Sequence, residues 1–216
     1  MDSVHLVFQY FDGLTDRQKM QFADLQGLYH DWNAKINVIS RKDIDSLYEH
    51  HVLHCLAIAK FLKFKDGSEI LDVGTGGGFP GIPLAILFPK CRFFLIDSIG
   101  KKINVCDAVS NQLELKNVEC RKENVSDEVR KFDFVVSRAV MSAPELFGKV
   151  RKNFSHKNNN AIPNGLLCLK GGNVEDEFKD SFTSLLKQAK LEYVSKWFEE
   201  PYFETKKILY LPNIVS

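Results

Sequence analysis

A glycine-rich stretch at residues 72–81 is the part of this sequence best suited to bind a ligand. It reads Asp-Val-Gly-Thr-Gly-Gly-Gly-Phe-Pro-Gly, follows an apolar run and opens a helical pattern. Glycines at such a junction permit positive φ angles and let a ligand approach the backbone, while the first N–H groups of the helix favour an anionic group. The sequence therefore predicts a ligand crevice at this loop.

The spacing of these glycines is compatible with two classes of cofactor. Gly76, Gly78 and Gly81 satisfy the dinucleotide fingerprint, and Asp97 lies where an acid that binds a ribose is expected. An NAD-dependent oxidoreductase and a non-catalytic nucleotide-binding module are therefore alternatives to a methyltransferase. Asp72 before the first glycine favours the methyltransferase, as does an expected antiparallel pair of strands at the end of the sheet.

The region after residue 65 predicts a Rossmann-like α/β fold, because short apolar runs alternate with helix-length segments. We expect helices from about residues 81, 101, 144 and 175. The last two strands must be antiparallel, since a parallel return needs a crossover of a dozen residues or more. We thus predict a mostly parallel seven-stranded sheet with terminal antiparallel strands, at residues 69–73, 92–97, 117–121, 132–137, 166–170, 191–198 and 206–211.

The segment before residue 65 predicts two or three helices, because apolar residues recur there near 3.6 spacing. Thr15 or Asp16 can cap one of them, since short side-chain oxygens accept from the free N–H groups of a first turn. We therefore divide the chain into an N-terminal helical extension, residues 1–65, and a core, residues 66–216.

Composition indicates a cytoplasmic protein with one main core. The chain has 216 residues, 44% of them hydrophobic, and its formal net charge is +1, so a nucleic acid would have to be held by a local basic patch. The five cysteines contain no CxxC pair, which argues against a disulfide framework. Neither a signal peptide nor an apolar run of about 20 residues is recognisable.

Several motifs together resemble the RsmG (GidB) family of methyltransferases. They are WNAKINV at 32–38, HVL at 51–53, DVGTGGGFPGIPLA at 72–85, LIDSIGKK at 95–102, FDFVVSRA at 132–139 and LKGG at 169–172. The resemblance covers most of the chain and implies a class I methyltransferase core with S-adenosylmethionine as cofactor. It also implies N7 of a guanine in 16S rRNA as acceptor, in free RNA or in a small-subunit particle.

The resemblance implies cofactor-binding residues as well. The glycine loop would face the methionine moiety, Asp97 would accept from the ribose hydroxyls, and the backbone near Asn124 and Val125 would hold the adenine. His54 and Asn124 depart from the usual pattern of the family, which has Asp and frequently Arg there. The full set of expected cofactor-binding residues is Asp72, Gly74, Gly76, Gly78, Phe79, Asp97, Asn124, Val125 and Arg138.

Methylation of guanine N7 needs no obligatory base, because N7 carries an exposed lone pair and the transfer depends on alignment. The fourth strand ends in Ser137-Arg138-Ala139, unlike the Asn/Asp-Pro-Pro-aromatic run of enzymes that methylate exocyclic amines. We expect Arg138 at the carboxyl edge of the sheet, where ligands bind, although a structural salt bridge is the alternative. The candidate catalytic residues are Arg138 and Ser137, and the candidate RNA-binding residues are Arg138, Lys170, Arg41 and Lys42.

Three histidines, His50, His51 and His54, lie close together in the extension. Residues at i and i+4 share a helix face, but the glutamate of an HExxH zinc motif is missing, so we expect packing or hydrogen bonding and no metal. A methyltransferase of small molecules remains the nearest alternative to an RNA-modifying enzyme.

Overall fold

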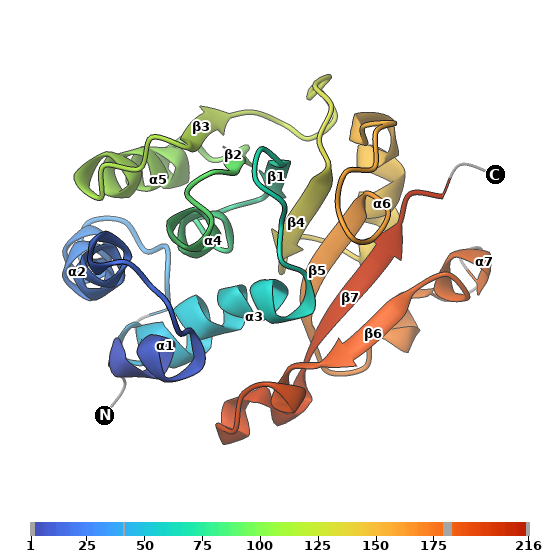
Figure 1. The fold of residues 1–216 in the computed structure, drawn as a ribbon. Coiled ribbons are helices and arrows are strands. Elements are labelled where there is room, and N and C mark those ends of the chain that lie inside the picture. The colour runs from blue at the N-terminus through green and yellow to red at the C-terminus, as the bar shows by residue number, and fades with distance from the viewer. Residues whose placement is uncertain (1–2, 41, 179–182, 215–216) are drawn as a thin grey trace.

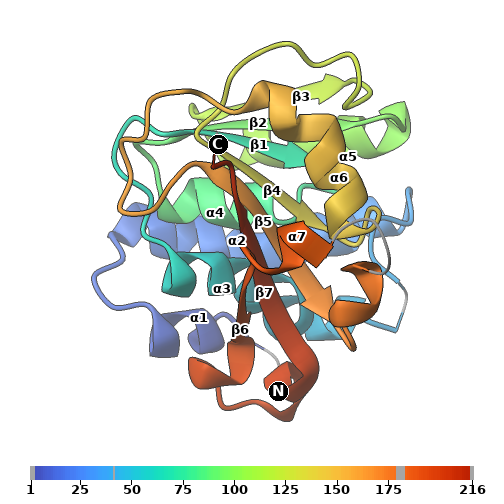
Figure 2. The same ribbon diagram turned by 90° about the vertical axis from the view of Figure 1, so that its right-hand side faces the viewer.

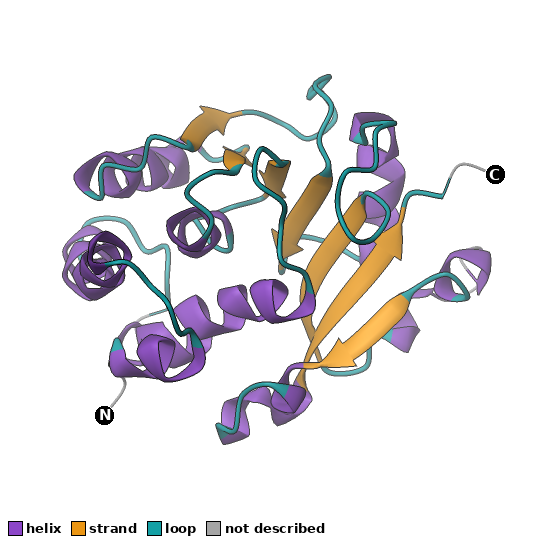
Figure 3. Ribbon diagram, viewed as in Figure 1, coloured by secondary structure: helices purple, strands orange, loops and turns teal. Residues whose placement is uncertain are grey.

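The computed structural model describes residues 3–40, 42–178 and 183–214, and it shows an α/β fold with helices on both faces of a seven-stranded sheet (Figures 1 and 3). The strand order is β3-β2-β1-β4-β5-β7-β6. The first five strands are parallel, and β7 is antiparallel to both β5 and β6. The strands are β1 Glu69–Val73, β2 Arg92–Asp97, β3 Val118–Lys122, β4 Phe134–Arg138, β5 Gly165–Gly171, β6 Lys190–Tyr193 and β7 Lys206–Pro212.

This topology confirms the predicted sheet. The last strand of the chain, β7, lies between β5 and β6 and is antiparallel to both. Dinucleotide-binding folds have the strand order 3-2-1-4-5-6, so this sheet argues against the oxidoreductase alternative. The helices α4 Gly81–Leu87, α5 Gly100–Gln112 and α6 Ala143–Val150 begin within a residue of the predicted positions.

Two predicted elements differ in form from what the sequence predicts. The strand expected at 191–198 ends at Tyr193, because the buried Val194 and Phe198 lie four residues apart, a helical spacing, and Phe198 N donates to Val194 O. A 3-10 turn, η6 Val194–Lys196, occupies that place. The helix expected from residue 175 is another 3-10 turn, η4 Glu175–Phe178, and a four-residue helix, α7 Thr183–Leu186, follows.

The N-terminal extension contains more elements than predicted. Thr15 caps α2 through a reciprocal pair of bonds with Gln18, as its sequence position suggested. The apolar segment from residue 44 to residue 61 begins with a 3-10 turn and a π-helix, and only its last eight residues are α-helical. The elements are α1 His5–Tyr10, α2 Asp16–Asn33, η1 Ile44–Ser46, η2 Leu47–Leu53 and α3 His54–Phe61.

The extension covers one face of the sheet together with α4 and α5, and α6 lies on the opposite face (Figures 1 and 2). Because strand side chains alternate between faces, Phe93 and Leu95 of β2 join the buried cluster of the extension, whereas Phe94 and Ile96 join the cluster around α6. The extension and the sheet therefore share one continuous apolar layer.

Hydrogen bonds fasten the extension at two distant points. The buried hydroxyl of Tyr29 in α2 donates to Gly77 O of the glycine loop at 2.7 Å. The hydroxyl of Tyr10 in α1 donates to the carboxylate of Glu200 at 3.0 Å and accepts from Glu199 N at 3.0 Å. The extension thus contacts both the loop after β1 and the segment before β7.

Asp72, at the end of β1, holds the glycine loop in shape. Its Oδ2 accepts from Thr75 Oγ1 at 2.6 Å and from Gly81 N at 2.8 Å, so one oxygen joins the start of the loop to the start of α4. Its Oδ1 is buried without a partner, and burial raises the pKa of this carboxyl to about 7. Gly74 and Gly78 adopt φ angles of 66° and 108°, which favour glycine.

Within the described residues, no helix is long and apolar enough to cross a membrane.

The raised pKa of Asp72 predicts a pH-dependent stability. The unfolded carboxyl ionises near pH 4, so between about pH 4 and pH 7 the folded protein binds the extra proton, and stability falls as pH rises. The asparagine of Asp72→Asn does not titrate. The free energy of unfolding of the wild type relative to this variant should therefore fall by up to about 1.4 kcal/mol per pH unit in that window. Urea unfolding of both proteins measures the difference, and a constant difference from about pH 5 to pH 8 would contradict the assignment.

Candidate functional site

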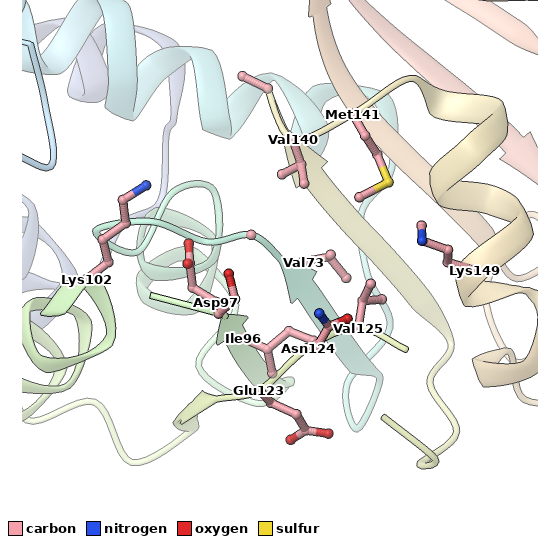
Figure 4. Close-up of a pocket in the computed structure, with 13 residues that line it drawn as sticks. Val73, Ile96, Asp97, Lys102, Glu123, Asn124, Val125, Val140, Met141 and Lys149 are labelled. Carbon is pink, nitrogen blue, oxygen red and sulfur yellow. The ribbon is translucent and has the colours of Figure 1, made fainter. Parts of the chain in front are cut away.

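A cavity of about 360 Å³ lies at the carboxyl ends of β1, β2 and β4, where ligands bind in open α/β sheets (Figure 4). Figure 4 shows Asp97 and Lys102 on one side of this first cavity, and Met141 and Lys149 on the other. Its lining residues are Val73, Gly74, Ile96, Asp97, Ser98, Lys102, Glu123, Asn124, Val125, Ala139, Val140, Met141 and Lys149.

Asp97 supplies the carboxylate of the first cavity, and its side chain is held rigidly. Oδ2 accepts from Gly76 N at 3.0 Å and Oδ1 accepts from Ile99 N at 2.8 Å, while the residue is 7% exposed. Each carboxylate oxygen can accept a further bond. The carboxylate therefore joins the glycine loop to the start of α5 and still offers acceptors to a ligand.

The first cavity fits the expected S-adenosylmethionine. A carboxylate suited to a pair of hydroxyl groups stands beside the apolar side chains of Ile96 and Val125, which suit a flat adenine ring. A cavity of this size lies in the range of small-molecule sites. The carboxylate and the apolar side chains thus suit the ribose and the base of a nucleoside.

The loop after β4 closes one side of the first cavity. Ala139 has a φ of 55°, unusual for a residue with a side chain, and Val140 packs so closely on Gly74 that a Cβ there would lie 2.3 Å from its Cγ2. Lys170 Nζ donates to Met141 O at 3.0 Å and pairs with Glu177 at 2.9 Å. The loop is therefore fixed at both ends.

A second cavity, of about 350 Å³, lies between the extension and the core. Ala139 lines both cavities, so they adjoin at the end of β4. The rings of His50 and Tyr202 stack in its wall with centroids 3.9 Å apart. Its lining residues are Asp43, His50, His51, His54, Arg138, Ala139, Leu169, Lys170, Gly171, Tyr202 and Lys206.

Arg138 connects the core to the extension at this second cavity. Its NH2 donates to His51 Nδ1 at 2.9 Å, its NH1 donates to His50 O at 3.4 Å, and the guanidinium lies over the Phe79 ring at 5.2 Å. Since Arg138 can only donate, His51 Nδ1 accepts and its proton lies on Nε2. Burial, followed by the charge of Arg138, lowers the pKa of His51 to about 3, so the ring is neutral at pH 7.

The π-helix η2 carries His50 and His51, and His54 begins α3, so all three histidines line the second cavity, where His54 is 5% exposed. Desolvation lowers the pKa of His54 well below its ordinary value. Residues 3–40, 42–178 and 183–214 contain no cluster of His, Cys, Asp or Glu that could hold a metal ion.

The structure brings four of the expected cofactor-binding residues to the first cavity: Gly74, Asp97, Asn124 and Val125. The other five lie elsewhere. Asp72 is wholly buried behind the loop, and Phe79 stacks against Tyr29 with ring centroids 4.7 Å apart. Gly76 and Gly78 support the loop without lining the cavity, and Arg138 faces the second cavity.

The candidate catalytic and RNA-binding residues are also separated. Ser137 is buried and donates its hydroxyl to Val73 O at 3.0 Å, which joins β4 to β1. Lys170 lines the second cavity, and its ammonium group forms an ion pair with Glu177. Lys42 is exposed and lines neither cavity, and Arg41 lies outside the described residues.

Sequence reasoning missed several residues of the two cavities. The first includes Glu123 and Met141, each just beyond the end of a parallel strand, and the rule that ligands bind at carboxyl edges would have found them. The second includes Asp43, Tyr202 and Lys206. These three had no comparable signal, because they meet only when the extension packs beside the segment before β7.

Comparisons with known proteins give the family. Residues 18–202 match the GidB family, described as rRNA small subunit methyltransferase G. The ribosomal RNA small subunit methyltransferase G of Bacteroides thetaiotaomicron is 54% identical over 210 residues, 96% of this chain and 98% of that protein. That of Parabacteroides distasonis is 55% identical over 210 residues, 96% and 88% of the two chains.

A solved structure supports the fold. The precorrin-6y C5,15-methyltransferase of Geobacter metallireducens has a TM-score of 0.53 at 13% identity, covering 81% of this chain and 90% of that one. Such a likeness speaks for the fold alone, whereas the matches in sequence run over nearly the whole chain. On that evidence the chain belongs to the GidB family, the rRNA small subunit methyltransferases G.

Proposed function

We propose that this protein transfers the methyl group of S-adenosylmethionine to N7 of a guanine in 16S rRNA, free or within a small-subunit particle, in the cytoplasm. One observation carries the proposal beyond family membership. A cavity that fits a nucleoside adjoins, at Ala139, a second cavity lined by aromatic rings and cations. A methyl donor and an acceptor base placed in the two cavities meet at the end of β4.

In the first cavity, this chain's residues bind and orient the cofactor. Asp97 accepts hydrogen bonds from the ribose hydroxyls, Ile96 and Val125 lie against the adenine, and the glycine loop with Gly74 faces the methionine end. Bound S-adenosylmethionine supplies an electrophilic methyl group. Asp72 stays behind the loop and acts by holding its shape.

In the second cavity, the residues position the acceptor. Guanine N7 attacks with a lone pair and releases no proton, so the site needs alignment and no general base. The neutral His51, whose pKa is lowered to about 3, suits this role because it cannot act as an acid at pH 7. Arg138 and Lys206 supply positive charge for the RNA backbone.

The proposal is tested by product mapping. Unmodified small-subunit RNA and unmodified small-subunit particles are each incubated with the protein and methyl-labelled S-adenosylmethionine, and 7-methylguanosine is located in the product. Label at one guanine N7 supports the proposal. Label at another ring position would contradict the assignment to N7, and the absence of label from both the RNA and the particles would favour a methyltransferase of small molecules.

Asp97→Asn should weaken cofactor binding. The amide keeps one oxygen to accept from Gly76 N, loses the bond that Ile99 N donates, and lacks the charge that strengthens bonds from the ribose hydroxyls. We expect the Kd for S-adenosylmethionine to rise about tenfold, equivalent to about 1.4 kcal/mol.

Isothermal titration calorimetry measures this Kd. Asp107→Asn makes the same chemical change at an exposed position of α5 and should bind as the wild type does. Equal affinities of Asp97→Asn and wild type would remove Asp97 from the site.

Arg138→Ala should lower the rate of methylation on the order of 100-fold. The substitution removes the bonds to His50 O and His51 Nδ1, so the wall that aligns the acceptor base with the methyl group is no longer held in place. Cofactor affinity should stay unchanged, since Arg138 does not line the first cavity. Single-turnover methylation measures the effect, and the exposed Arg151→Ala serves as the matched control. Unchanged turnover of Arg138→Ala would rule out its positioning role.

A further inference from the structure

The second cavity contains one carboxylate among several cations. Of its described lining residues, only Asp43 is acidic, while Arg138, Lys170 and Lys206 are basic. The side chain of Asp43 is 42% exposed, so it remains accessible to a ligand. The Asp43 carboxylate repels the phosphate groups of RNA, which the cations of this cavity attract. Its presence is explained if it binds hydrogen-bond donors of the acceptor base.

Asp43 is held in a defined orientation. Its Oδ2 accepts from Ser40 Oγ at 2.6 Å and its Oδ1 accepts from His50 Nδ1 at 3.1 Å. These bonds, that from Ser40 first, lower the pKa of the carboxyl, so it is ionised at neutral pH and acts only as an acceptor. Each oxygen keeps a lone pair for a further donor. The carboxylate can therefore accept two parallel bonds.

An aromatic stack stands beside this carboxylate. The His50 ring that Asp43 holds lies nearly parallel to the Tyr202 ring, with an interplanar angle of 15°. The Tyr202 hydroxyl donates to His50 O at 3.3 Å, and Lys206 Nζ lies 4.3 Å from the centre of the Tyr202 ring. Flat aromatic side chains at a polar pocket are a common platform for an unstacked RNA base.

We propose that the second cavity holds the acceptor guanine extruded from the RNA, and that Asp43 selects guanine by accepting hydrogen bonds from its N1–H and N2–H groups. The inference rests on the proposed function and names the determinant of specificity at its acceptor site. Adenine presents an acceptor at N1 and no amino group at C2, so it cannot make this pair of bonds. An enzyme that modifies a base commonly extrudes it and recognises its pairing edge in this way.

The orientation of the base agrees with the chemistry. In guanine, N7 lies on the side of the ring system opposite the N1 and N2 edge. A base whose pairing edge lies on Asp43, in the extension, directs N7 away from the extension toward the core. Ala139 is the core residue at which the second cavity adjoins the cofactor cavity.

Binding of nucleotides tests the selection without requiring activity. With the first cavity filled by excess S-adenosylhomocysteine, GMP, IMP and AMP are titrated by ligand-observed NMR into wild type, Asp43→Asn and Asp45→Asn. All three nucleotides carry the same phosphate, so the cations contribute equally. We expect wild type to bind GMP about tenfold more tightly than AMP, with IMP between them because it lacks the N2 amino group.

Asp43→Asn should lose the preference for GMP over AMP, because its amide offers one acceptor and one donor in place of two acceptors. Asp45→Asn makes the same change at an exposed position of η1 and should behave as wild type. Equal affinities for GMP and AMP in the wild type would overturn the inference and indicate that the cavity binds phosphate only.

Methylation of the small-subunit substrate provides the second measurement. Asp43→Asn should lower kcat/KM about tenfold while leaving the Kd for S-adenosylmethionine and the thermal unfolding temperature unchanged. Methylation of rRNA by an Asp43→Asn protein with unaltered kcat/KM would overturn the inference and leave the proposed function intact. Selective binding of GMP without methylation of any rRNA would overturn the proposed function alone.

Discussion

The two bonds accepted by Asp72 Oδ2 determine the shape of the ligand-binding edge. One buried oxygen joins Thr75 in the glycine loop to Gly81 at the start of α4, so the turn between β1 and α4 cannot open without exposing a buried carboxyl. Asp97 repeats this arrangement one strand away by joining Gly76 to Ile99. The first cavity is therefore built from backbone held by carboxylates, and its shape depends little on mobile side chains.

The second cavity depends on a different constraint, which is the packing of the extension on the sheet. Arg138 makes the connection from the core, because its guanidinium lies on Phe79 and donates to two groups of the extension. Tyr29 makes the reciprocal connection from the extension to the glycine loop. The two cavities are thus linked through Phe79 and Gly77, two residues of one loop.

The sequence predicted the sheet well because strands covered on both faces read as continuous apolar runs, as in β1 and β2. It also placed Gly74 and Asp97 at the first cavity, although their contacts with a cofactor stay predictions. The direction of Arg138 and the pairing of Lys170 with Glu177 were beyond sequence reasoning, since both depend on segments that approach only in the folded chain. The prediction that the sixth strand extends to Phe198 was wrong, because the apolar residues of a buried 3-10 turn cannot be told by composition from those at the end of a strand.

The bond from the Tyr202 hydroxyl to His50 O joins two sides of the second cavity and spans 152 residues. At the usual elongation rates, roughly 8 to 30 seconds separate the synthesis of these two residues. During that interval the apolar stripe of α2 and α3 has no completed sheet to cover. The time needed to finish the chain therefore sets the earliest moment at which the second cavity exists, and a nascent chain that ends near residue 200 lacks the wall formed by Tyr202 and Lys206.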